Sequence, residues 1–512
     1  MGALPQQTRT FTVTPVAPDL LYPPRSQAPR SNPRPNERSN LAWDVFLDLD
    51  AQPHGSLRER LTAALRAAIR AGRLAPGAVL PPSRNLAVEL RCSRWAVTEA
   101  YNQLAVEGHL EARQGSATRV CAPTPQATES STPAPAPVRY DLAPGRPDLR
   151  AFPNRRWLEA LRSTMVTGAL TDLAYPQVGG NPTLRELIAD YLRRSRGAHA
   201  GAADVVITNG VTGGVARACW ALRNAGITAL AVEDPGRPQL RKVAATQGLE
   251  VVGIPVDDEG LRVDHLARHP GLRAVLVTPA HQLPSGAAMS SARRAALLSW
   301  AHAADALVLE DDSYAPFRYG GRPARTLQSL DPDRVLLLGS TSTTLAPAIG
   351  IGWLLCPRAW APQLTAACFP PPSGLIQATL ARFLETGAYD RHLLTSRNRY
   401  RARRTELVEH LAAALPEARI GGADAGLHLV AHLPARIKSA AVVRSLNRDG
   451  VRISDLDTYR IRPDPQAPGL VIGYGNLPDA AVEGAVERIA AVVRIGLPIR
   501  HRIGLPTERP RT

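Results

Sequence analysis

The sequence predicts a multidomain protein, with a small N-terminal α+β domain followed by a larger α/β domain that ends in a small C-terminal α+β subdomain. A chain of 512 residues is too long for one ordinary core, and its 44% hydrophobic content is enough to bury more than one. A proline-rich stretch at 122–138 separates two regions. Strand and helix patterns alternate only in the second region, which predicts a mainly parallel, seven-stranded sheet there.

We expect five segments along the chain. Residues 1–42 are rich in Pro, Arg, Ser and Asn without periodicity, which predicts a disordered extension. The other segments are a small domain at 43–121, the linker at 122–138, a large domain at 139–494 whose small subdomain spans about 400–494, and a basic tail at 495–512.

The charge of the chain is strongly positive. A formal net charge of +16 favours a polyanionic partner. Nearly all of the 61 basic residues are arginine, because the sequence contains only two lysines, Lys242 and Lys438. Any chemistry that needs a lysine therefore has two candidates.

The cysteines and the hydropathy pattern exclude several classes of protein. The five cysteines are scattered and form no Cys-x-x-Cys pair, which argues against a disulfide framework and against a zinc site. No run of 18 uncharged apolar residues occurs, and the first 20 residues do not have the pattern of a secretory signal. We expect a cytoplasmic protein without a membrane partner.

The first region predicts three helices and a hairpin. Leu57, Leu61, Leu65 and Ile69 recur at helical spacing, and glycine at 72 suits the end of that helix. A short second helix is expected to be capped at Pro81-Pro82-Ser83 and to bury Leu86 and Leu90. A third helix is expected to be capped by Ser93 and to bury Val97, Tyr101 and Leu104. A hairpin of residues 110–112 with 118–120 follows.

This order of elements is that of a winged helix-turn-helix. It exposes one face of the third helix to a DNA major groove, while the wing can approach phosphate or the minor groove. Residues 56–120 hold ten arginines against five glutamates, a net charge of +5. The charge and the geometry together predict salt-sensitive binding to double-stranded DNA.

Residues 72–120 (GRLAPGAVLPPSRNLAVELRCSRWAVTEAYNQLAVEGHLEARQGSATRV) resemble the winged helix of the GntR family of regulators. The resemblance implies that Arg84 and Arg94 contact DNA, with Ser93 and Thr98 beside them and Gly115 at the wing tip. The alternative is that both arginines are only solvated charges on a helix face.

Two positions depart from the GntR pattern. Arg91 stands in the turn where the family usually has glycine, and Ala96 stands where it has threonine. An arginine forced to positive φ costs roughly 1 kcal/mol. Because Ala96 also removes a hydroxyl, the operator sequence of the family does not transfer to this chain.

The second region predicts strands that alternate with helices. Seven short β-branched and apolar runs mark the strands: 205–208, 229–233, 251–254, 274–278, 306–310, 335–339 and 351–355. Ligands of such sheets bind at the carboxyl ends of the strands. Polar side chains follow several of these runs, namely Asn209, Thr278, His281, Gln282, Glu310, Asp311, Asp312, Ser340 and Ser342.

At these places residues 139–490 resemble the fold type I aminotransferases, and the arrangement after a GntR winged helix resembles the MocR subfamily of regulators. The motifs include YPQVGGNPTLRELIADYL, VEDPGRP, TPAHQLPSG, LEDDSYAPFRYGGRP and GSTSTTLAP. The resemblance implies a domain that binds pyridoxal phosphate (PLP) as an imine on a lysine and uses the cofactor to sense a ligand.

The resemblance assigns a cofactor-like pocket to seven residues. Asp311 matches the carboxylate that pairs with the pyridine nitrogen. Tyr314 matches the tyrosine at the ring hydroxyl. The others are His281 and Gln282 beside the ring, Ser340 and Ser342 at the phosphate, and Gly210 after the first strand.

Two positions of this pocket depart from the family. Thr343 stands where the family has the imine-forming lysine, and Gly350 stands where it has the arginine that grips the phosphate. Lys242 and Lys438 lie outside the strand-end motifs, so neither is expected to replace the lost lysine. We expect no covalent PLP and doubt a non-covalent complex.

The leading hypothesis is a homodimeric DNA-binding transcription regulator whose aminotransferase-like domain supplies dimerisation and senses an unknown small-molecule effector. One alternative is a PLP-dependent aminotransferase with an appended DNA-binding domain, for which Thr343 is the main difficulty. Another is a scaffold that binds no small molecule, in which Asp311 and its neighbours only pair with one another. A metal at Glu310 to Asp312 is disfavoured because no histidines cluster there.

Overall fold

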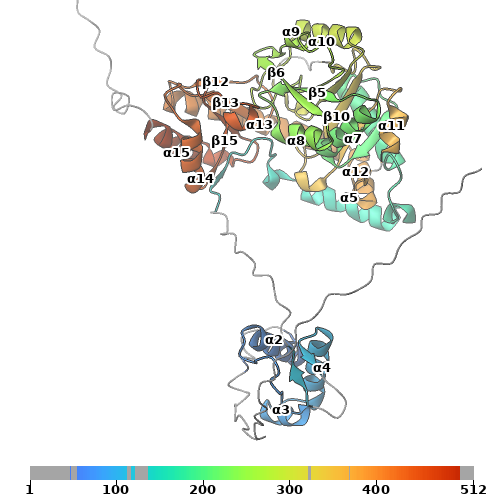
Figure 1. Cartoon of the computed structure of the whole chain (residues 1–512), viewed down its shortest axis with the longest axis vertical. Coiled ribbons are helices and arrows are strands. Elements are labelled where there is room, and N and C mark those ends of the chain that lie inside the picture. Colours follow the sequence, from blue (N-terminus) through green and yellow to red (C-terminus); the bar gives the residue numbers. More distant parts are fainter. Residues whose placement is uncertain are drawn as a thin grey trace, which may run out of the picture. The chain divides into compact units, whose positions relative to one another are not determined.

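The computed structural model describes Leu47 and residues 55–111, 117–121, 137–320, 325–367 and 369–495 (Figure 1). The predicted extension at 1–42, most of the linker, all but the first residue of the tail and Gly115 lie outside these residues. The chain divides into two compact units, residues 1–134 and 135–512, which we describe separately. Within the described part, no helix is both long and apolar enough to cross a membrane.

The first unit begins with helix α2 (Leu57–Arg70), as predicted. Its N-cap is Ser56, whose hydroxyl accepts a hydrogen bond from the Glu59 backbone while the Glu59 carboxylate accepts one from the Ser56 backbone. This reciprocal capping box satisfies two of the backbone donors left free at a helix start. The chain turns out of the helix at Gly72, whose φ of 70° favours glycine.

Helices α3 (Ser83–Glu89) and α4 (Arg94–Val106) complete the predicted helix-turn-helix, and strands β1 (Leu110–Glu111) and β2 (Arg119–Val120) pair antiparallel as the wing. The N-cap of α3 is Pro82, which lies within the predicted Pro81-Pro82-Ser83 cap and makes no side-chain hydrogen bond. The Ser83 hydroxyl accepts a hydrogen bond from Arg94.

The turn between α3 and α4 contains the strained residue that the sequence predicted. Arg91 has φ of 48°, in the region where a residue with a Cβ is disfavoured. The core around this turn is apolar, and Leu65, Leu86, Val97 and Leu104 are fully buried in it. Their burial offsets the cost of the turn.

The second unit contains one large mixed sheet of eight strands in the order β4-β11-β10-β9-β8-β5-β6-β7. All seven predicted strands are present: β4 (Val205–Thr208), β5 (Ala229–Asp234), β6 (Glu250–Asp257), β8 (Ala274–Val277), β9 (Leu307–Asp311), β10 (Val335–Ser340) and β11 (Gly352–Leu355). The eighth, β7 (Gly260–Leu261), was missed because two residues are too few for a pattern. Only β7 and β11 run antiparallel to their neighbours in this sheet.

Helices cover both faces of this sheet. Successive residues of β8 point to opposite faces of the sheet. Leu276 belongs to the hydrophobic cluster that packs against α7 and α8, and Val275 belongs to the cluster that packs against α10. The helices of this domain are α5 (Asn154–Thr167), α6 (Pro182–Arg196), α7 (Gly210–Asn224), α8 (Pro238–Thr246), α9 (Val263–Leu266), α10 (Ser291–Ala303), α11 (Ala361–Ala366) and α12 (Gly374–Glu385). Short 3-10 helices lie at η1 (Leu149–Ala151), η2 (Leu170–Leu173), η3 (Ala202–Asp204), η4 (Ala315–Phe317), η5 (Pro347–Ile349), η6 (Leu456–Tyr459) and η7 (Asp479–Ala481).

The small subdomain packs helices against an antiparallel sheet of order β12-β13-β16-β15. Its strands are β12 (Arg419–Gly421), β13 (His428–His432), β15 (Ser454–Asp455) and β16 (Gly469–Gly473), and its helices are α13 (Ala388–Ala414), α14 (Ser439–Arg448) and α15 (Val482–Ile495). In addition, β3 (Tyr140–Asp141) pairs with β14 (Val451–Arg452), so the first residues after the linker belong to this subdomain. The sequence placed them in the large domain because their partner strand lies about 310 residues further along the chain.

Candidate functional site

The starts of α3 and α4 carry four of the five predicted DNA-contacting residues, Arg84, Ser93, Arg94 and Thr98. Arg84 and Arg94 are exposed, and Arg94 Nε donates to Ser83 Oγ at 3.4 Å, which links α3 to α4. Ser93 Oγ accepts the Ala96 backbone N–H at 3.2 Å, so this hydroxyl caps the helix. Thr98 Oγ1 donates to the Arg94 carbonyl at 2.9 Å. The two arginines are therefore the predicted contacts that point outward with their charge available.

One further candidate on this helix was missed. Trp95 is 66% exposed at the N-terminal end of α4, next to Arg94. A large exposed aromatic side chain at the start of this helix, beside an exposed arginine, is a candidate for interaction with a partner. The signal in the sequence was its place outside the buried stripe of Val97, Tyr101 and Leu104.

In the second unit, the ends of β4 and β10 bring three predicted residues together. A Cβ built on Gly210 would lie 3.8 Å from the hydroxyls of both Ser340 and Ser342. Ser340 Oγ donates to Ser342 Oγ at 3.1 Å and accepts the Ser342 backbone N–H at the same distance. This cluster lies at the N-terminal end of α7, where backbone N–H groups favour an anion.

Asp311 ends the neighbouring strand β9 and is fully buried. Its Oδ1 accepts hydrogen bonds from the backbone and the hydroxyl of Ser313. Its Oδ2 accepts a hydrogen bond from Arg237 Nη1 at 2.7 Å. Arg237, at the start of α8, was not among the predicted site residues, because nothing in a VEDPGRP motif indicates which carboxylate its arginine contacts.

Tyr314 and His281 pack against a third ring, that of His428 in β13. The ring centroids of His281 and His428 are 4.5 Å apart, and those of His281 and Tyr314 are 5.9 Å apart. Burial lowers the pKa of His428 to about 4 and that of His281 well below its ordinary value. Both histidines are therefore neutral at physiological pH.

Gln282 is also buried, and its amide joins two strand ends. Its Nε2 donates to the Pro235 carbonyl at 2.7 Å and to Glu233 Oε2 at 3.3 Å. Burial raises the pKa of Glu233 to about 7. Gln282 is thus part of an internal hydrogen-bond network that includes residues 233–235, just before Arg237 in the chain.

The acidic run Glu310 to Asp312 is divided between the two faces of β9, because successive residues of a strand point to opposite sides. Glu310 accepts the backbone N–H groups of Leu327 and Gln328, each at 3.0 Å. Asp312 accepts two hydrogen bonds from Arg196 at 2.7 and 2.8 Å. Among the described residues no group of three or more His, Cys, Asp or Glu could hold a metal ion.

Thr343 is held by the fold at the position that the resemblance gives to the imine lysine. Its buried hydroxyl donates to the Ser313 carbonyl at 2.8 Å. Gly350 has φ of 67°, and a Cβ added there would meet no atom within 4 Å. Lys242 is exposed on α8, and Lys438 is exposed as the N-cap of α14.

Comparison with known proteins supports both halves of this description. Residues 57–120 match the family of bacterial regulatory proteins described as the gntR family, and residues 142–489 match aminotransferase class I and II. The chain is 33% identical to the HTH-type pyridoxine biosynthesis transcriptional regulator PdxR of Corynebacterium glutamicum, over 88% of this chain and 99% of that protein. It is 31% identical to the probable rhizopine catabolism regulatory protein MocR of Rhizobium meliloti, over 90% and 97% of the two chains.

The chain belongs to the GntR family of regulators, MocR type. Solved aminotransferases share the fold of its second unit. A crystal structure of an archaeal alanine:glyoxylate aminotransferase matches with a TM-score of 0.65 and 22% identity, over 70% of this chain and 91% of that one. Pyrococcus horikoshii kynurenine aminotransferase matches with a TM-score of 0.64 and 23% identity, over the same shares.

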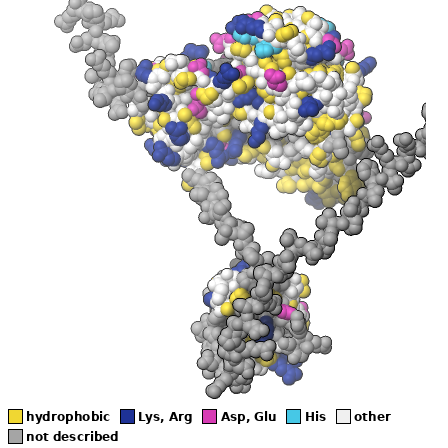
Figure 2. All heavy atoms as spheres, in the orientation of Figure 1, with side chains coloured by type: hydrophobic (Ala, Val, Ile, Leu, Met, Phe, Trp, Pro, Cys, Tyr) yellow, Lys and Arg dark blue, Asp and Glu magenta, His cyan; other side chains and the backbone are white. Residues whose placement is uncertain are grey.

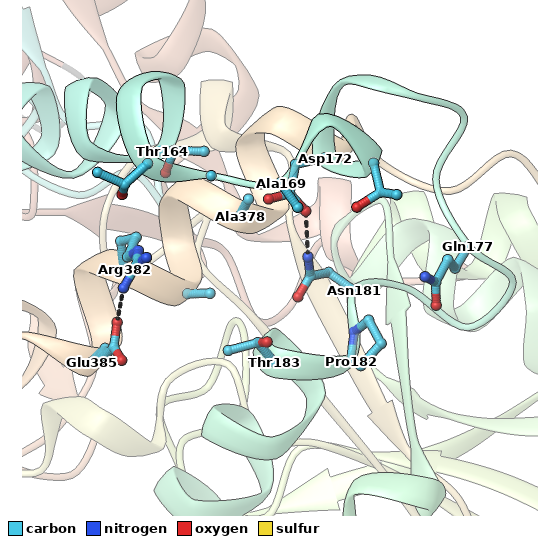
Figure 3. Close-up of a pocket in the computed structure, with 14 residues that line it drawn as sticks. Thr164, Ala169, Asp172, Gln177, Asn181, Pro182, Thr183, Ala378, Arg382 and Glu385 are labelled. Carbon is cyan, nitrogen blue, oxygen red and sulfur yellow. Dashed lines mark hydrogen bonds and ion pairs between the residues drawn. The ribbon is translucent and has the colours of Figure 1, made fainter.

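A wider pocket of this GntR-type chain lies away from the cofactor-like pocket, between α5, η2, α6 and α12 (Figure 3). It has a volume of about 510 Å³. Its polar groups pair with one another: Asn181 donates to Asp172 at 3.1 Å, and Arg382 donates to Glu385 at 2.8 Å. The sequence did not predict it, because its walls come from segments about 200 residues apart.

Proposed function

We propose that this GntR-family protein is a DNA-binding transcription regulator whose aminotransferase-like domain does not form a PLP imine and does not catalyse transamination. The observation that carries the proposal is the state of position 343. Its hydroxyl is bonded to a backbone carbonyl of the pocket, and a hydroxyl cannot form an imine. The two relatives compared above, over nearly their full length, are named as regulators.

The remaining residues of the pocket do not fit imine-linked PLP. In this fold, bound PLP supplies an electron sink through its ring. Both lysines of the chain are exposed on other elements, and Gly350 offers no charge to a phosphate. One charge-assisted hydrogen bond is worth about 1.5–3 kcal/mol, so the loss of an arginine alone weakens phosphate binding by roughly 10- to 150-fold. We therefore derive no chemical step through this cofactor.

We propose Arg84 and Arg94 as the principal contacts to double-stranded DNA, with Ser93, Thr98 and Gly115 beside them. The exposure of both guanidiniums supports this assignment. Gly115 lies outside the described residues, and Ser93 acts chiefly as a helix cap. We assign the DNA-binding domain to 43–121 and the aminotransferase-like domain to 139–494, with the tail from 495.

We propose that the protein acts as a homodimer through the face around α5 and η2. Seven apolar side chains between positions 158 and 178 are exposed there: Leu158, Met165, Val166, Leu170, Leu173, Tyr175 and Val178. Tyr175 is 98% exposed and Leu170 is 86% exposed. Figure 1 places α5 at the lower edge of the second unit, and Figure 2 shows hydrophobic side chains gathered at that edge. So large an exposed apolar patch favours a protein partner, and a second copy would let two winged helices read two half-sites.

Mobility shift on DNA of the protein's own promoter region tests the regulator. The expected result is binding that weakens with salt and is lost in Arg94→Ala. Arg66→Ala is the matched control, because Arg66 already pairs with Glu107 through two hydrogen bonds of 2.9 and 2.6 Å. Binding that is insensitive to salt, or equal in the two variants, would contradict the proposal.

An absorption spectrum with added PLP, followed by borohydride reduction, tests the aminotransferase alternative. We expect no reducible imine, and a stable one mapped to Lys242 or Lys438 would restore that alternative. Thermal stability across vitamin B6 compounds and amino acids separates an effector sensor from a scaffold without ligands, since a ligand at 100 times its Kd stabilises by about 2.7 kcal/mol.

A further inference from the structure

The carboxylate assigned to the cofactor ring already has a donor on each oxygen. Arg237 Nη1 lies 2.7 Å from Asp311 Oδ2, and Ser313 donates twice to Oδ1. Asp311 is fully buried, whereas the Arg237 side chain keeps 23% of its surface exposed. The Arg237 side chain therefore reaches solvent, whereas its carboxylate partner does not.

Two small cavities lie next to the segments that carry this pair, and Asp311 lines neither of them. The cavity beside Arg237, which Glu233 and Thr278 also line, has a volume of about 10 Å³. The cavity beside Ser313 and Ser340 also has a volume of about 10 Å³. A single water molecule needs about 10–15 Å³, so neither cavity holds a six-membered ring.

The turn that carries Arg237 is fixed by contacts other than its own side chain. The Gly236 backbone N–H donates to the Tyr459 carbonyl at 2.9 Å, and Arg241 donates to the carbonyls of Gly236 and Arg460 at 3.3 and 3.2 Å. These bonds tie the start of α8 to the small subdomain. The guanidinium is thus held in position before any ligand arrives, which lowers the entropy cost of its bond to Asp311.

We propose that Arg237 is an internal substitute for the ring nitrogen of the cofactor: its guanidinium neutralises Asp311 and closes the pocket to pyridine-type ligands. The proposal rests on the proposed function, in which no imine anchors such a ligand. A protonated ring nitrogen would offer Asp311 one charged donor in exchange for the one it has, and would leave Arg237 without its carboxylate. Arg237 thereby determines the specificity of the pocket.

Chemical rescue in the full chain tests this proposal. Arg237→Ala leaves a buried carboxylate beside a hole of guanidinium shape, and its Tm is expected to fall by about 5 °C. Methylguanidinium chloride at about 10 mM, against the same concentration of sodium chloride, is expected to raise the Tm of this variant by about 3 °C through binding at the hole. This rescue tests the ion pair between Arg237 and Asp311, and exclusion of a ligand is tested separately below.

Two proteins serve as controls for the rescue. Wild type has no hole to fill, and Arg194→Ala removes a guanidinium that pairs with Asp390 at the exposed surface. Neither is expected to respond to methylguanidinium. An equal response in all three proteins, or an unchanged Tm in Arg237→Ala, would overturn the proposal.

Pyridoxamine 5′-phosphate tests the closed pocket directly, because it carries the ring nitrogen but forms no imine with a lysine. It is expected to leave the Tm of wild type unchanged, and a stabilised wild type would overturn the proposal. If Arg237→Ala does not fold, the pair Arg237→Met and Arg237→Met/Asp311→Asn replaces it. The side-chain amide introduced by Asp311→Asn would keep an oxygen for Ser313 without a charge, so the double variant is expected to be the more stable of the two. The opposite order would overturn the proposal, and none of these outcomes bears on DNA binding.

Discussion

The winged helix and the cofactor-like pocket use their arginines in opposite ways. Arg84 and Arg94 are exposed, and among the described residues neither pairs with a carboxylate. In the pocket, Arg237 pairs with Asp311, and behind the same strand Arg196 pairs with Asp312. An unpaired surface guanidinium is free to neutralise a DNA phosphate, whereas one that neutralises a buried carboxylate stabilises the fold.

This difference indicates where each unit finds its partner. In the first unit, Arg84 and Arg94 direct their charge outward, as suits binding to an external polyanion. In the second unit, the acidic and hydroxyl side chains that the sequence predicted for a cofactor-like pocket are bonded to arginines, backbone groups and one another. Keeping the fold of an enzyme is therefore compatible with a change of role, because the same polar residues that would bind a cofactor can pair internally.

The largest expected effect is on the buried pair behind β9. Arg196→Ala leaves the Asp312 carboxylate, whose side chain is 5% exposed, without its two donors. The free energy of unfolding of the second unit is expected to fall by about 3–5 kcal/mol, as measured by urea denaturation. The control is Arg194→Ala, an exposed pair whose loss is expected to cost at most about 1 kcal/mol. An equal loss of unfolding free energy in the two variants would show that a buried arginine pair stabilises the fold no more than an exposed pair.

The next effect is a dependence of stability on pH. His428 has a folded pKa of about 4 against an ordinary value of 6.5, so the unfolded chain binds more protons between these values. This group does not lower the free energy of unfolding above pH 6.5, and the free energy of unfolding falls as the pH drops from 6.5 toward 4. The loss amounts to about 2 kcal/mol at pH 5.

Comparison with His428→Gln isolates this contribution from that of other groups. Glutamine does not titrate and can still donate to the Gln282 carbonyl, which His428 Nε2 contacts at 3.3 Å. Between pH 7 and 5, the Tm of wild type is expected to fall more than that of the variant. Parallel pH curves would show that the buried histidine is not held neutral.

A smaller effect is expected on DNA affinity when one outward arginine is removed. Arg84→Ala is expected to weaken operator binding by about 10- to 150-fold, the value of one charged hydrogen bond. The slope of log affinity against log salt is expected to fall by about 1. Fluorescence anisotropy at several salt concentrations measures both quantities. A variant with unchanged slope would mean that Arg84 is a solvated charge.

The smallest effect concerns the strained turn of the winged helix. Arg91→Gly is expected to stabilise the first unit by at most about 1 kcal/mol, because glycine adopts φ of 48° without a Cβ penalty. Ser93→Ala removes the cap of α4 and is expected to cost about 1 kcal/mol. Hydrogen exchange of the α3 and α4 amides measures both changes. Destabilisation by Arg91→Gly would show that its side chain makes a contact that the turn needs.

Much of the fold could be predicted because it depends on local patterns. The spacing of Leu57, Leu61, Leu65 and Ile69 predicted α2, and seven apolar runs predicted seven strands of the large sheet. The positive φ of Arg91 followed from the resemblance to the GntR family, which usually has glycine at this place in the turn. The pairing of β3 with β14 did not follow, because two-residue strands leave no periodicity.

The candidate site divides in the same way. The sequence alone predicted, through its resemblance to aminotransferases, that Thr343 and Gly350 stand where a lysine and an arginine would bind the cofactor, and it contains only two lysines. Only the tertiary structure decided that Arg237 contacts Asp311, 74 positions away, and that Gln282 donates a hydrogen bond to Glu233. The physical reason is that residue identity and periodicity are written along the chain. The partner of a buried charge depends instead on which loops converge at the carboxyl edge of the sheet.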